Sequence, residues 1–433
     1  MARRVVITGM GCVTPLGDSA DAIRQNVEAG RTAFRRSAIM PDVTESPVPD
    51  FHCADHAGRW KHAKYLSRGA QFALAAAVHA LDDAFGPDSA NKLPVSAGLY
   101  LGTGPNLDIA ADFPRAVGMP DKGQTNGLDH EGLSALWLLR YLPNTAASAI
   151  AQRLGLHGEN TTLGTACAAS LMALGTAFRA IRNGYQDVAL AGGGDSRLSS
   201  GGLLGYRKAS ALCDNPDLSA NAASRPFDAA RCGFVPAEGG AMFALEEREH
   251  AERRGARILG EVLGYGNSLD GHAMTAPEPD GRFAELAVRT ALREAALNPE
   301  DVDAVSAHGT STPLNDAAEA RLLERIFGQN AHGTAERDTA QGPLILAPKS
   351  WLGHGAAACG ALELAFCLAT LPHGMVPPVR NLATTDSPLR FAGHASRQTA
   401  CREKRYPETL LLQNFGFGGQ NAALLIRLAG EGR

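Results

Sequence analysis

The stretch Thr161–Gly175, TTLGTACAASLMALG, places one cysteine where a short β-rich run passes into an alanine-rich helical pattern. Small residues flank Cys167 on both sides, so a bulky reactant could reach its sulfur. A thiol buried only for packing would be expected among larger apolar neighbours. The apolar side chains after it share one helical face, and the pattern stops at Asn183-Gly184. The stretch therefore predicts a strand, a tight turn and a helix, which are the building unit of an α/β protein.

A second stretch repeats this plan later in the chain. Pro348–Gly360, PKSWLGHGAAACG, follows another strand-like run and leads into a helical pattern that stops at Pro372-His373-Gly374. Because β-rich runs alternate with longer helical patterns, we expect parallel sheets covered by helices. The repeat indicates a duplicated domain, and the charged segment Leu245–Gly260, helical in its spacing, is the expected seam between halves 1–257 and 258–433. The expected strands are Val5–Thr8, Gly98–Gly102, Thr161–Leu163 and Val188–Ala191 in the first half, and Ile258–Leu263, Val302–Ala307, Leu344–Ala347, Thr409–Leu412 and Ala422–Arg427 in the second.

Composition narrows the class of protein. With 433 residues, 45% of them hydrophobic, the chain can bury a large core, and its 48 glycines suit many tight turns. A formal net charge of -4 gives no broad basic surface of the kind that nucleic-acid binding needs. The eight cysteines form no CxxC pair or Cys/His cluster, so we expect neither a disulfide framework nor a metal site. Because the chain shows no apolar signal or apolar run of about 18 residues, we expect a cytoplasmic protein that does not enter a membrane.

Cys167 is the candidate nucleophile. At the start of a helix, its sulfur would lie near unpaired backbone N–H groups and the positive end of the helix dipole, which favours thiolate over thiol. The N–H of the same residue could then stabilise an oxyanion on an attacked carbonyl. A buried structural thiol is the alternative, and that interpretation fits the other seven cysteines.

Two histidines lie at comparable turns. The segment Ala307–Asp316, AHGTSTPLND, places His308 just after an expected strand, with glycine and small hydroxyl residues behind it. In PKSWLGHGAAACG, Lys349 and His354 precede an alanine-rich helix. A lone histidine is more often a core or surface residue than a catalyst, but two histidines at strand-to-helix turns rich in small residues fit a catalytic role as well as a structural one.

A glycine-rich turn lies close to the C-terminus. The segment Gln413–Asn421, QNFGFGGQN, stands between two expected strands. Glycine lets a backbone approach a ligand closely, so this turn could bring a second N–H group to the site, although an ordinary hairpin would have the same pattern. It is not a phosphate loop, because no helix with Lys-Ser or Lys-Thr follows it.

These motifs, in this order and at these spacings, resemble the elongating β-ketoacyl-acyl carrier protein synthases of fatty acid and type II polyketide synthesis. The similarity runs nearly end to end, from VVITGMGCVTPLG at residues 5–17 through RPFDAARCGFVPAEGGAMFALEE at residues 225–247 to the closing NAALLIRL. The resemblance implies the thiolase fold, in which two related α/β halves pack as a five-layered α-β-α-β-α sandwich. It also implies a homodimer, or a heterodimer with a chain-length factor, and no cofactor of its own, since phosphopantetheine arrives on the acyl carrier protein.

The resemblance also implies a reaction. Cys167 would accept an acyl group as a thioester, while His308 and His354 would hydrogen-bond the malonyl thioester carbonyl and support loss of carbon dioxide. The carbanion equivalent would then attack the acyl-Cys167 carbonyl, giving a 3-oxo chain two carbons longer. The backbone N–H groups of Cys167 and Phe417 would form an oxyanion hole. Lys349 would orient the site within a polar network that includes Glu319. Thr310 and Thr312 would contact the pantetheine arm, and Phe417 and Gly418 would form a gate to the acyl pocket. A structural ion pair is the alternative for Lys349.

The carrier protein of this family is normally acidic, so the resemblance implies a local basic patch. Arg59–Arg68 and Arg207-Lys208 are the candidates, although basic residues on a surface helix are usually only solvated.

Several positions depart from the family pattern. Asn414 and Gln420 stand where Ser and Thr are expected, Cys232 replaces an expected Asp, and Trp351 follows Lys349-Ser350 where a smaller residue is usual. The loop Pro114–Pro143, with Trp137 and Tyr141, also looks unlike the housekeeping enzyme. These departures leave acyl chain length and pathway open, and they fit a synthase of polyenes or other secondary products.

Two other functions remain as alternatives. A cysteine-dependent thioester hydrolase could be built from Cys167, a histidine and Asn421, but two histidines suit carbanion chemistry better than admission of water. The chain could instead be a chain-length or partner subunit of a ketosynthase heterodimer. Such partners typically lack the nucleophile, whereas Cys167, His308 and His354 are all present here.

Overall fold

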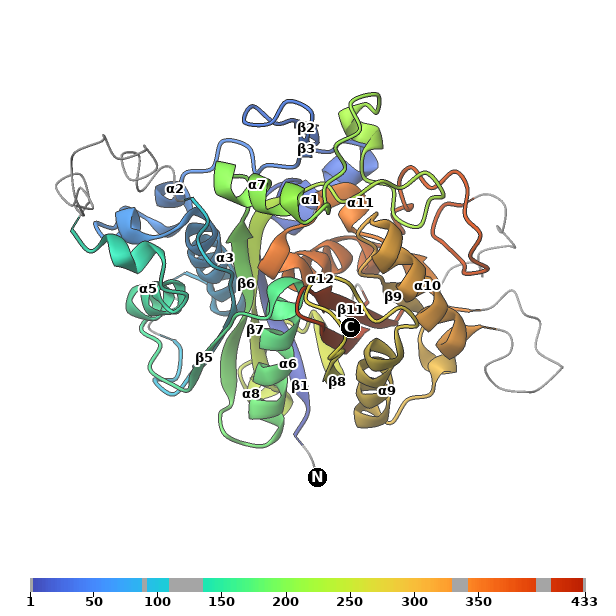
Figure 1. Ribbon diagram of the computed structural model, residues 1–433. Coiled ribbons are helices and arrows are strands. Elements are labelled where there is room, and N and C mark those ends of the chain that lie inside the picture. The colour runs from blue at the N-terminus through green and yellow to red at the C-terminus, as the bar shows by residue number, and fades with distance from the viewer. Residues whose placement is uncertain (1–2, 88–91, 109–134, 329–341, 395–405, 431–433) are drawn as a thin grey trace, which may run out of the picture.

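The computed structural model describes residues 3–87, 92–108, 135–328, 342–394 and 406–430. Ten strands form one sheet in the order β10-β9-β11-β12-β8-β1-β7-β6-β4-β5 (Figure 1). The first half supplies β1 (Val5–Val13), β4 (Gly98–Gly102), β5 (Asn160–Leu163), β6 (Val188–Ser196) and β7 (Glu238–Glu247). The second half supplies β8 (Gly260–Leu269), β9 (Ala304–Ser306), β10 (Leu344–Leu346), β11 (Thr409–Gly416) and β12 (Gln420–Leu428).

The strand order of the first half recurs in the second. Strands β5, β4 and β6 pair in parallel, while β7 and β1 continue the sheet antiparallel. Strands β10, β9 and β11 pair in parallel in the same way, and β12 and β8 continue antiparallel. Antiparallel pairing of β1 with β8 joins the two copies. The predicted duplication of the α/β plan is therefore confirmed, while a division of the chain at residue 257 stays a prediction.

Helices cover the sheet in layers (Figure 1). On the outer face of the first half lie α3 (Arg68–Phe85) and α5 (Thr145–Leu154), and on the outer face of the second lie α9 (Arg282–Ala295) and α10 (Pro313–Phe327). Between the halves, α6 (Ala169–Arg182) packs against α12 (Cys359–Thr370). This arrangement confirms the predicted α-β-α-β-α order. The shorter elements are α1 (Ala20–Glu28), α2 (Cys53–Ala57), α7 (Ser200–Lys208), α8 (Arg248–Arg253), α11 (Lys349–Leu352), β2 (Arg35–Arg36) and β3 (Thr44–Glu45).

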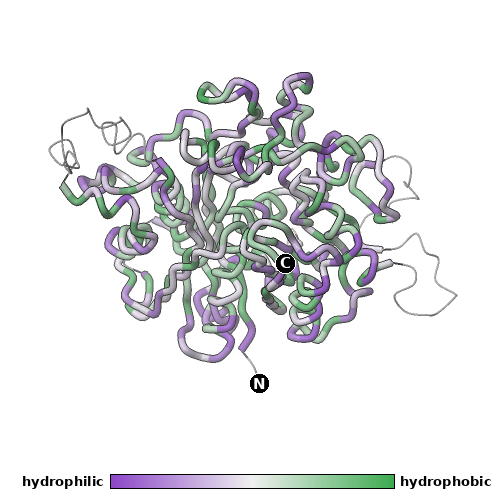
Figure 2. The backbone as a smooth tube through the Cα atoms, viewed as in Figure 1, coloured by the Kyte–Doolittle hydropathy of each residue, from purple (hydrophilic) through white to green (hydrophobic). Residues whose placement is uncertain are grey.

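The central strands are buried on both faces. In β11, Leu410 and Leu412 belong to the central core with α6 and α12, whereas Leu411 faces the core under α9 and α10. Hydrophobic segments gather in the interior and hydrophilic ones lie mostly at the periphery (Figure 2). A strand of this kind needs a nearly continuous apolar run rather than an alternating one.

All nine expected strands are present, but the segment 245–260 is helical over a shorter stretch than expected. Residues 245–247 belong to β7, which the sequence prediction missed, and only α8 is helical in the expected seam. The strand was missed for two reasons. Every residue of β7 is buried, so its side chains show no period-2 alternation of apolar and polar residues, and the glutamates at its ends fit a helical pattern.

One described stretch, Ala356–His373, is long and apolar enough to span a membrane, by length and composition alone. Some 89% of it is buried, because α12 forms part of the layer between the two halves.

Candidate active site

Cys167 lies on a one-turn 3-10 helix, Ala166–Ala168, immediately before α6. Strand β5 ends at Leu163, and the 3-10 turn begins three residues later at Ala166. The predicted strand, turn and helix are therefore confirmed. The hairpin between β11 and β12, which belongs to the second half, packs closely against this turn. A Cβ on Gly416 would lie 2.8 Å from the carbonyl oxygen of Thr165 and 3.2 Å from the backbone nitrogen of Cys167. Glycine at position 416 is therefore what allows the two halves to meet at the thiol.

The prediction of a resting thiolate is wrong. Burial raises the pKa of Cys167 to about 11, although the charges of Lys349 and Arg197 and a hydrogen bond from the backbone N–H of Phe417 lower it. The side chain is only 9% exposed, and the cost of desolvating an anion exceeds the help from the helix start and the nearby cations. At neutral pH the group is therefore a thiol.

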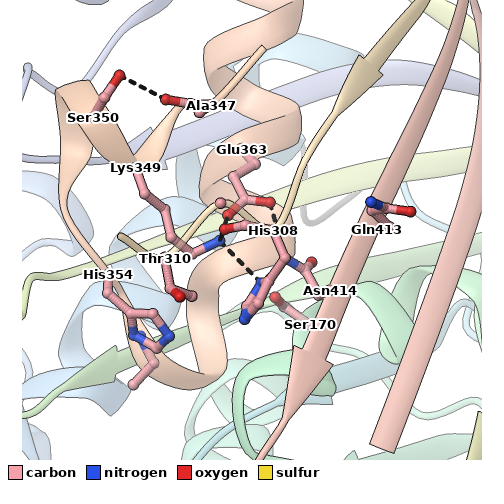
Figure 3. Close-up of polar contacts among 12 residues, drawn as sticks. Ser170, His308, Thr310, Ala347, Lys349, Ser350, His354, Glu363, Gln413 and Asn414 are labelled. Carbon is pink, nitrogen blue, oxygen red and sulfur yellow. Dashed lines mark hydrogen bonds and ion pairs between the residues drawn. The ribbon is translucent and has the colours of Figure 1, made fainter. Parts of the chain in front are cut away.

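His308 follows β9 at the start of a buried loop. Its backbone N–H and that of Gly309 donate to the carboxylate of Glu319, at 2.6 and 2.8 Å. On the ring, Nδ1 lies 3.1 Å from Nζ of Lys349 and 3.2 Å from Nδ2 of Asn414 (Figure 3). An ammonium group has no lone pair to offer, so Nδ1 must accept and the ring proton must lie on Nε2.

His308 is held neutral. Burial, followed by the charges of Lys349 and His354, places the pKa of His308 well below its usual value. The neutral ring therefore presents Nε2–H as a donor and has no proton to give from Nδ1.

His354 lies between the short helix α11 and the 3-10 helix Ala356–Ala358, and not directly after a strand as expected. Other contacts hold its ring in the same tautomer as that of His308. Its Nδ1 accepts the backbone N–H of Ala356 at 3.2 Å, and its ring stacks on Phe234 with centroids 4.4 Å apart and planes 21° apart. Burial and then the charge of Lys349 lower the pKa of His354 to about 3. The centroids of the His308 and His354 rings are 5.9 Å apart. The structure thus brings together two neutral imidazoles that each carry the proton on Nε2.

Lys349 is a buried ammonium between these rings. It forms an ion pair with Glu363 of α12 and donates to the carbonyl oxygen of His308 at 2.6 Å (Figure 3). Burial is the largest effect and lowers the pKa of Lys349, but the charge and hydrogen bond of Glu363, together with the charges of Cys359 and Glu319, outweigh it, so the pKa lies above its usual value. A lysine that stays charged cannot act as the base, which agrees with the predicted orienting role and equally with the ion-pair alternative.

Sequence reasoning missed Glu363 as the partner of Lys349. Its carboxylate also accepts from Nδ2 of Asn414 at 2.9 Å, so Asn414 links Glu363 to His308. Glu319 instead accepts backbone N–H groups of the His308 loop and Nε2 of Gln413 at 2.5 Å. Burial raises the pKa of Glu319 to about 7 despite these donors. A glutamate within the apolar helix pattern after PKSWLGHGAAACG was the available signal for Glu363.

The predicted substrate-contact residues lie around the same cluster. The hydroxyls of Thr310 and Thr312 are 2.9 Å apart, and the backbone N–H of Thr310 donates to Asp316 at 3.0 Å. Phe417 is 38% exposed, and the backbone N–H of Gly418 donates to the carbonyl oxygen of Met274 at 2.7 Å. Contact of these residues with a substrate stays a prediction.

The positions that depart from the family pattern have separate surroundings. Trp351 Nε1 donates to the carbonyl oxygen of Pro378 at 2.8 Å, and Oε1 of Gln420 is buried without a partner among the described residues. Cys232 lies beside Cys213, whose pKa is lowered to about 7, chiefly by their hydrogen bond. Of the loop 114–143, residues 114–134 lie outside the described residues, while the rings of Trp137 and Tyr141 meet edge to face at 5.9 Å.

Arginines of both predicted basic segments have acidic partners. Arg68 donates to Glu238 at 2.7 and 2.8 Å, and Arg207 is paired with Asp42. These two side chains are therefore less available to an acidic partner than sequence reasoning assumed, and the docking patch stays a prediction. In the part of the chain that the structure describes, no group of three or more His, Cys, Asp or Glu side chains is placed to hold a metal ion.

Comparison with known proteins gives the family. The model of the β-ketoacyl synthase N-terminal domain matches residues 2–251, and that of the C-terminal domain matches residues 259–383. The chain belongs to the β-ketoacyl synthase family. It is 33% identical to 3-oxoacyl-(acyl-carrier-protein) synthase 2 of Synechocystis sp. (strain ATCC 27184 / PCC 6803 / Kazusa), covering 98% of each chain.

Solved structures of ketosynthases are similar to this chain in fold. The ishigamide ketosynthase/chain length factor is 30% identical with a TM-score of 0.83, covering 99% of this chain and 100% of that one. A ketosynthase structure with a type II polyketide acyl-carrier protein, bound to the hexaketide, is 28% identical with a TM-score of 0.81 and the same coverage. These likenesses confirm the predicted thiolase fold.

Proposed function

We propose that this β-ketoacyl synthase condenses an acyl group on Cys167 with malonyl-carrier protein, and that His308 and His354 stabilise the charge that develops. The proposal is carried by one observation. Both imidazoles accept a hydrogen bond at Nδ1 and so present Nε2–H, with ring centroids 5.9 Å apart. Two neutral donors can stabilise an enolate oxygen without protonating the carbon that must attack.

The first half-reaction transfers the acyl group. The Cys167 sulfur attacks the acyl thioester of the carrier protein, the carbon-sulfur bond to the carrier breaks, and the Cys167 proton leaves with the carrier thiol. The oxyanion formed on the way would be held by the backbone N–H groups of Cys167 and Phe417, the second of which already donates to the Cys167 sulfur. Lys349 and Arg197 lower the cost of the transient thiolate by their charge.

The second half-reaction forms the new bond. The malonyl carbon-carbon bond breaks, carbon dioxide leaves, and the electron pair moves toward the thioester oxygen between the two Nε2–H groups. The resulting carbon attacks the acyl-Cys167 carbonyl, the carbon-sulfur bond to Cys167 breaks, and the sulfur leaves as a thiolate that takes up a proton from water to return to the resting thiol. Each well-placed donor is worth about 3 kcal/mol in oxyanion sites of this kind. Lys349 holds His308 in the required tautomer.

The alternatives fit the geometry less well. A hydrolase triad would need Asn421 beside a histidine, but Nδ2 of Asn421 donates to Asp270 at 2.6 Å. A chain-length subunit would not need Cys167 at the meeting point of the hairpin and α6. We propose the acyl carrier protein as the partner, as in the type II polyketide complex. Pairing with a second copy or with a chain-length factor stays a prediction, as do a cytoplasmic location and the lack of a bound cofactor.

The test is to incubate the purified protein with malonyl-carrier protein and a series of acyl-carrier proteins and to weigh the products. We expect acylation of Cys167, lost in Cys167→Ala, and a 3-oxoacyl product two carbons longer. His308→Ala and His354→Ala should still acquire the acyl group but condense poorly. An acyl adduct that survives Cys167→Ala, or free acid released without malonyl consumption, would contradict the proposal.

A further inference from the structure

Two cysteines outside the candidate active site lie side by side. Cys213 follows α7 in the chain, and Cys232 belongs to the segment RPFDAARCGF at residues 225–234. Both are free cysteines that pack into one small apolar cluster with Phe34 and Val235, and their side chains are hydrogen-bonded to each other. Cys213 is 2% exposed, whereas Cys232 is half-buried. Cys232 is one of the positions that depart from the family pattern, and the proposed condensation gives it no role.

The backbones beside the two cysteines are also in contact. The N–H of Cys213 donates to the carbonyl oxygen of Phe234 at 3.0 Å, and Leu212 and Phe234 pair as a parallel bridge. A Cβ on Gly233 would lie 2.4 Å from the carbonyl oxygen of Leu212 and 2.5 Å from the backbone nitrogen of Cys213. Only glycine therefore allows the chain after Cys232 to lie this close to Cys213. The two sulfurs are thus carried by segments that are fixed against each other.

The hydrogen bond makes the pair reactive toward oxidants. It lowers the pKa of Cys213 to about 7 and raises the pKa of Cys232, so near neutral pH much of the pair holds one thiolate and one thiol. A thiolate is the form of cysteine that reacts with oxidants, and a second thiol beside it can then close a disulfide. Cys167, whose pKa is about 11, holds far less thiolate at this pH.

The segment that follows Cys232 contacts the candidate active site at His354. The ring of Phe234 stacks on the ring of His354 with centroids 4.4 Å apart. The carbonyl oxygen of Val235 accepts the backbone N–H of His354 at 2.7 Å. Residues 234 and 235 therefore set the position of the His354 ring.

The same segment contacts the loop of His308. The backbone N–H of Gly233 donates to the carbonyl oxygen of Ser311 at 2.9 Å. A disulfide bond is about 2.05 Å long, much shorter than a hydrogen bond between two sulfurs. Its formation would draw Cys232 toward Cys213 and displace the segment that contacts both histidine loops. A displacement of about 1 Å at a reacting group can slow a reaction about 100-fold.

We propose that Cys213 and Cys232 are a site of reversible oxidation, at which hydrogen peroxide forms a disulfide that slows the condensation by displacing His354. The effect on rate rests on the proposed condensation, whereas the disulfide itself does not.

The oxidation takes two steps. With the shared proton on Cys213, the Cys232 sulfur attacks an oxygen of hydrogen peroxide, the oxygen–oxygen bond breaks, and the hydroxide that leaves takes up a proton to become water. The Cys213 sulfur then attacks the sulfenic acid on Cys232, the sulfur–oxygen bond breaks, and the oxygen leaves as a second water with the Cys213 proton. Each sulfur gives up one electron, and these two electrons reduce the peroxide.

The disulfide is tested in Cys167→Ala, in which the candidate nucleophile cannot react. After treatment with hydrogen peroxide, this protein should be lighter by two hydrogen atoms, and a digest without reductant should contain a peptide that joins Cys213 to Cys232. Dithiothreitol should reverse both changes. Adding Cys232→Ser should abolish the cross-link. Adding Cys53→Ser, which removes another buried cysteine, on α2, is the matched control and should keep it.

The effect on rate is tested in the chain with Cys167 intact. Peroxide is removed before acyl- and malonyl-carrier protein are added. The oxidised wild type should condense about tenfold or more slowly than the reduced one and recover with dithiothreitol, while Cys232→Ser should keep its rate. Cys213→Ser makes the same test if the first variant does not fold.

The outcomes separate the two claims. Oxidation without a cross-link, or a cross-linked enzyme that condenses as fast as the reduced one, overturns the proposal. An equal loss of rate in the wild type and in Cys232→Ser places the oxidation on another cysteine and also overturns it. A reduced wild type that condenses no primer contradicts the proposed function instead, and the cross-link in Cys167→Ala is still decided by mass.

Discussion

Replacement of His354 separates a donor role from a proton-transfer role. The ring accepts the Ala356 N–H at Nδ1, and its pKa is about 3, so at pH 7 only about one molecule in ten thousand carries an imidazolium there. The reacting oxygen would therefore meet a neutral N–H. A glutamine amide can place a neutral N–H at nearly the same reach, whereas alanine has none.

The expected loss follows from the number of donors removed. One oxyanion donor is worth about 2.7–4 kcal/mol, so His354→Ala should slow malonyl decarboxylation by about 100- to 1000-fold. His354→Gln should recover at least about tenfold of that loss, although it also gives up the stacking on Phe234. Transfer of the acyl group to Cys167 should change far less in both variants.

The assay measures carbon dioxide release from malonyl-carrier protein by enzyme whose Cys167 has already been acylated. Intact mass confirms equal acylation before the reaction begins. The wild-type rate should show no acid limb from His354 between pH 5 and 8. Equal rates for the glutamine and alanine variants, or a wild-type rate that falls with an apparent pKa near 6.5, would refute the donor reasoning.

Three further predictions concern the buried charges of the site. Because the pKa of Cys167 is about 11, the rate of its alkylation by iodoacetamide should rise about tenfold per pH unit from pH 7 to 10, with Cys167→Ala as the blank. A rate that levels off near pH 7 would mean that Cys167 rests as a thiolate. Lys349→Met should lower the free energy of unfolding in urea by about 3–5 kcal/mol, because the Glu363 carboxylate is left buried without its ion-pair partner. Adding Glu363→Gln to this variant should restore part of the lost free energy. If the losses of the two single variants simply add in the double variant, the ion pair is contradicted. The pKa of His354 is about 3 in the folded chain and 6.5 in the unfolded chain, so below pH 6.5 the unfolded chain binds more protons. From pH 6 to 4, the free energy of unfolding of the wild type should therefore fall by up to about 1.4 kcal/mol per pH unit relative to that of His354→Gln. Parallel curves of unfolding free energy against pH for the two proteins would argue against a buried neutral ring.

The turns that carry the chemistry could be predicted because small residues and strand-to-helix changes are local signals. Cys167 and His308 were placed correctly at turns after strands, whereas His354 follows the short helix α11 rather than a strand. Strand β7 was missed because both of its faces are buried, which removes the alternation that identifies a strand. The ionisation state of Cys167 was predicted wrongly, since burial depends on the second half closing over the turn, and no local pattern reports that.

The partners of the candidate catalytic residues were harder to predict than the residues themselves. Glu363 reaches Lys349 from the next helix, and Asn414 reaches His308 from a strand more than 100 residues away. Contacts of this kind follow from topology, which spacing along the chain does not reveal.

The most direct test of the donor geometry is the tautomer of the two imidazoles at pH 7. Nitrogen-15 spectra of histidine-labelled enzyme can be assigned by their loss in His308→Ala and His354→Ala. Both rings should show a protonated Nε2 and an unprotonated Nδ1, unchanged down to about pH 5. An imidazolium signal, or a proton on Nδ1 of either ring, would contradict the two-donor account.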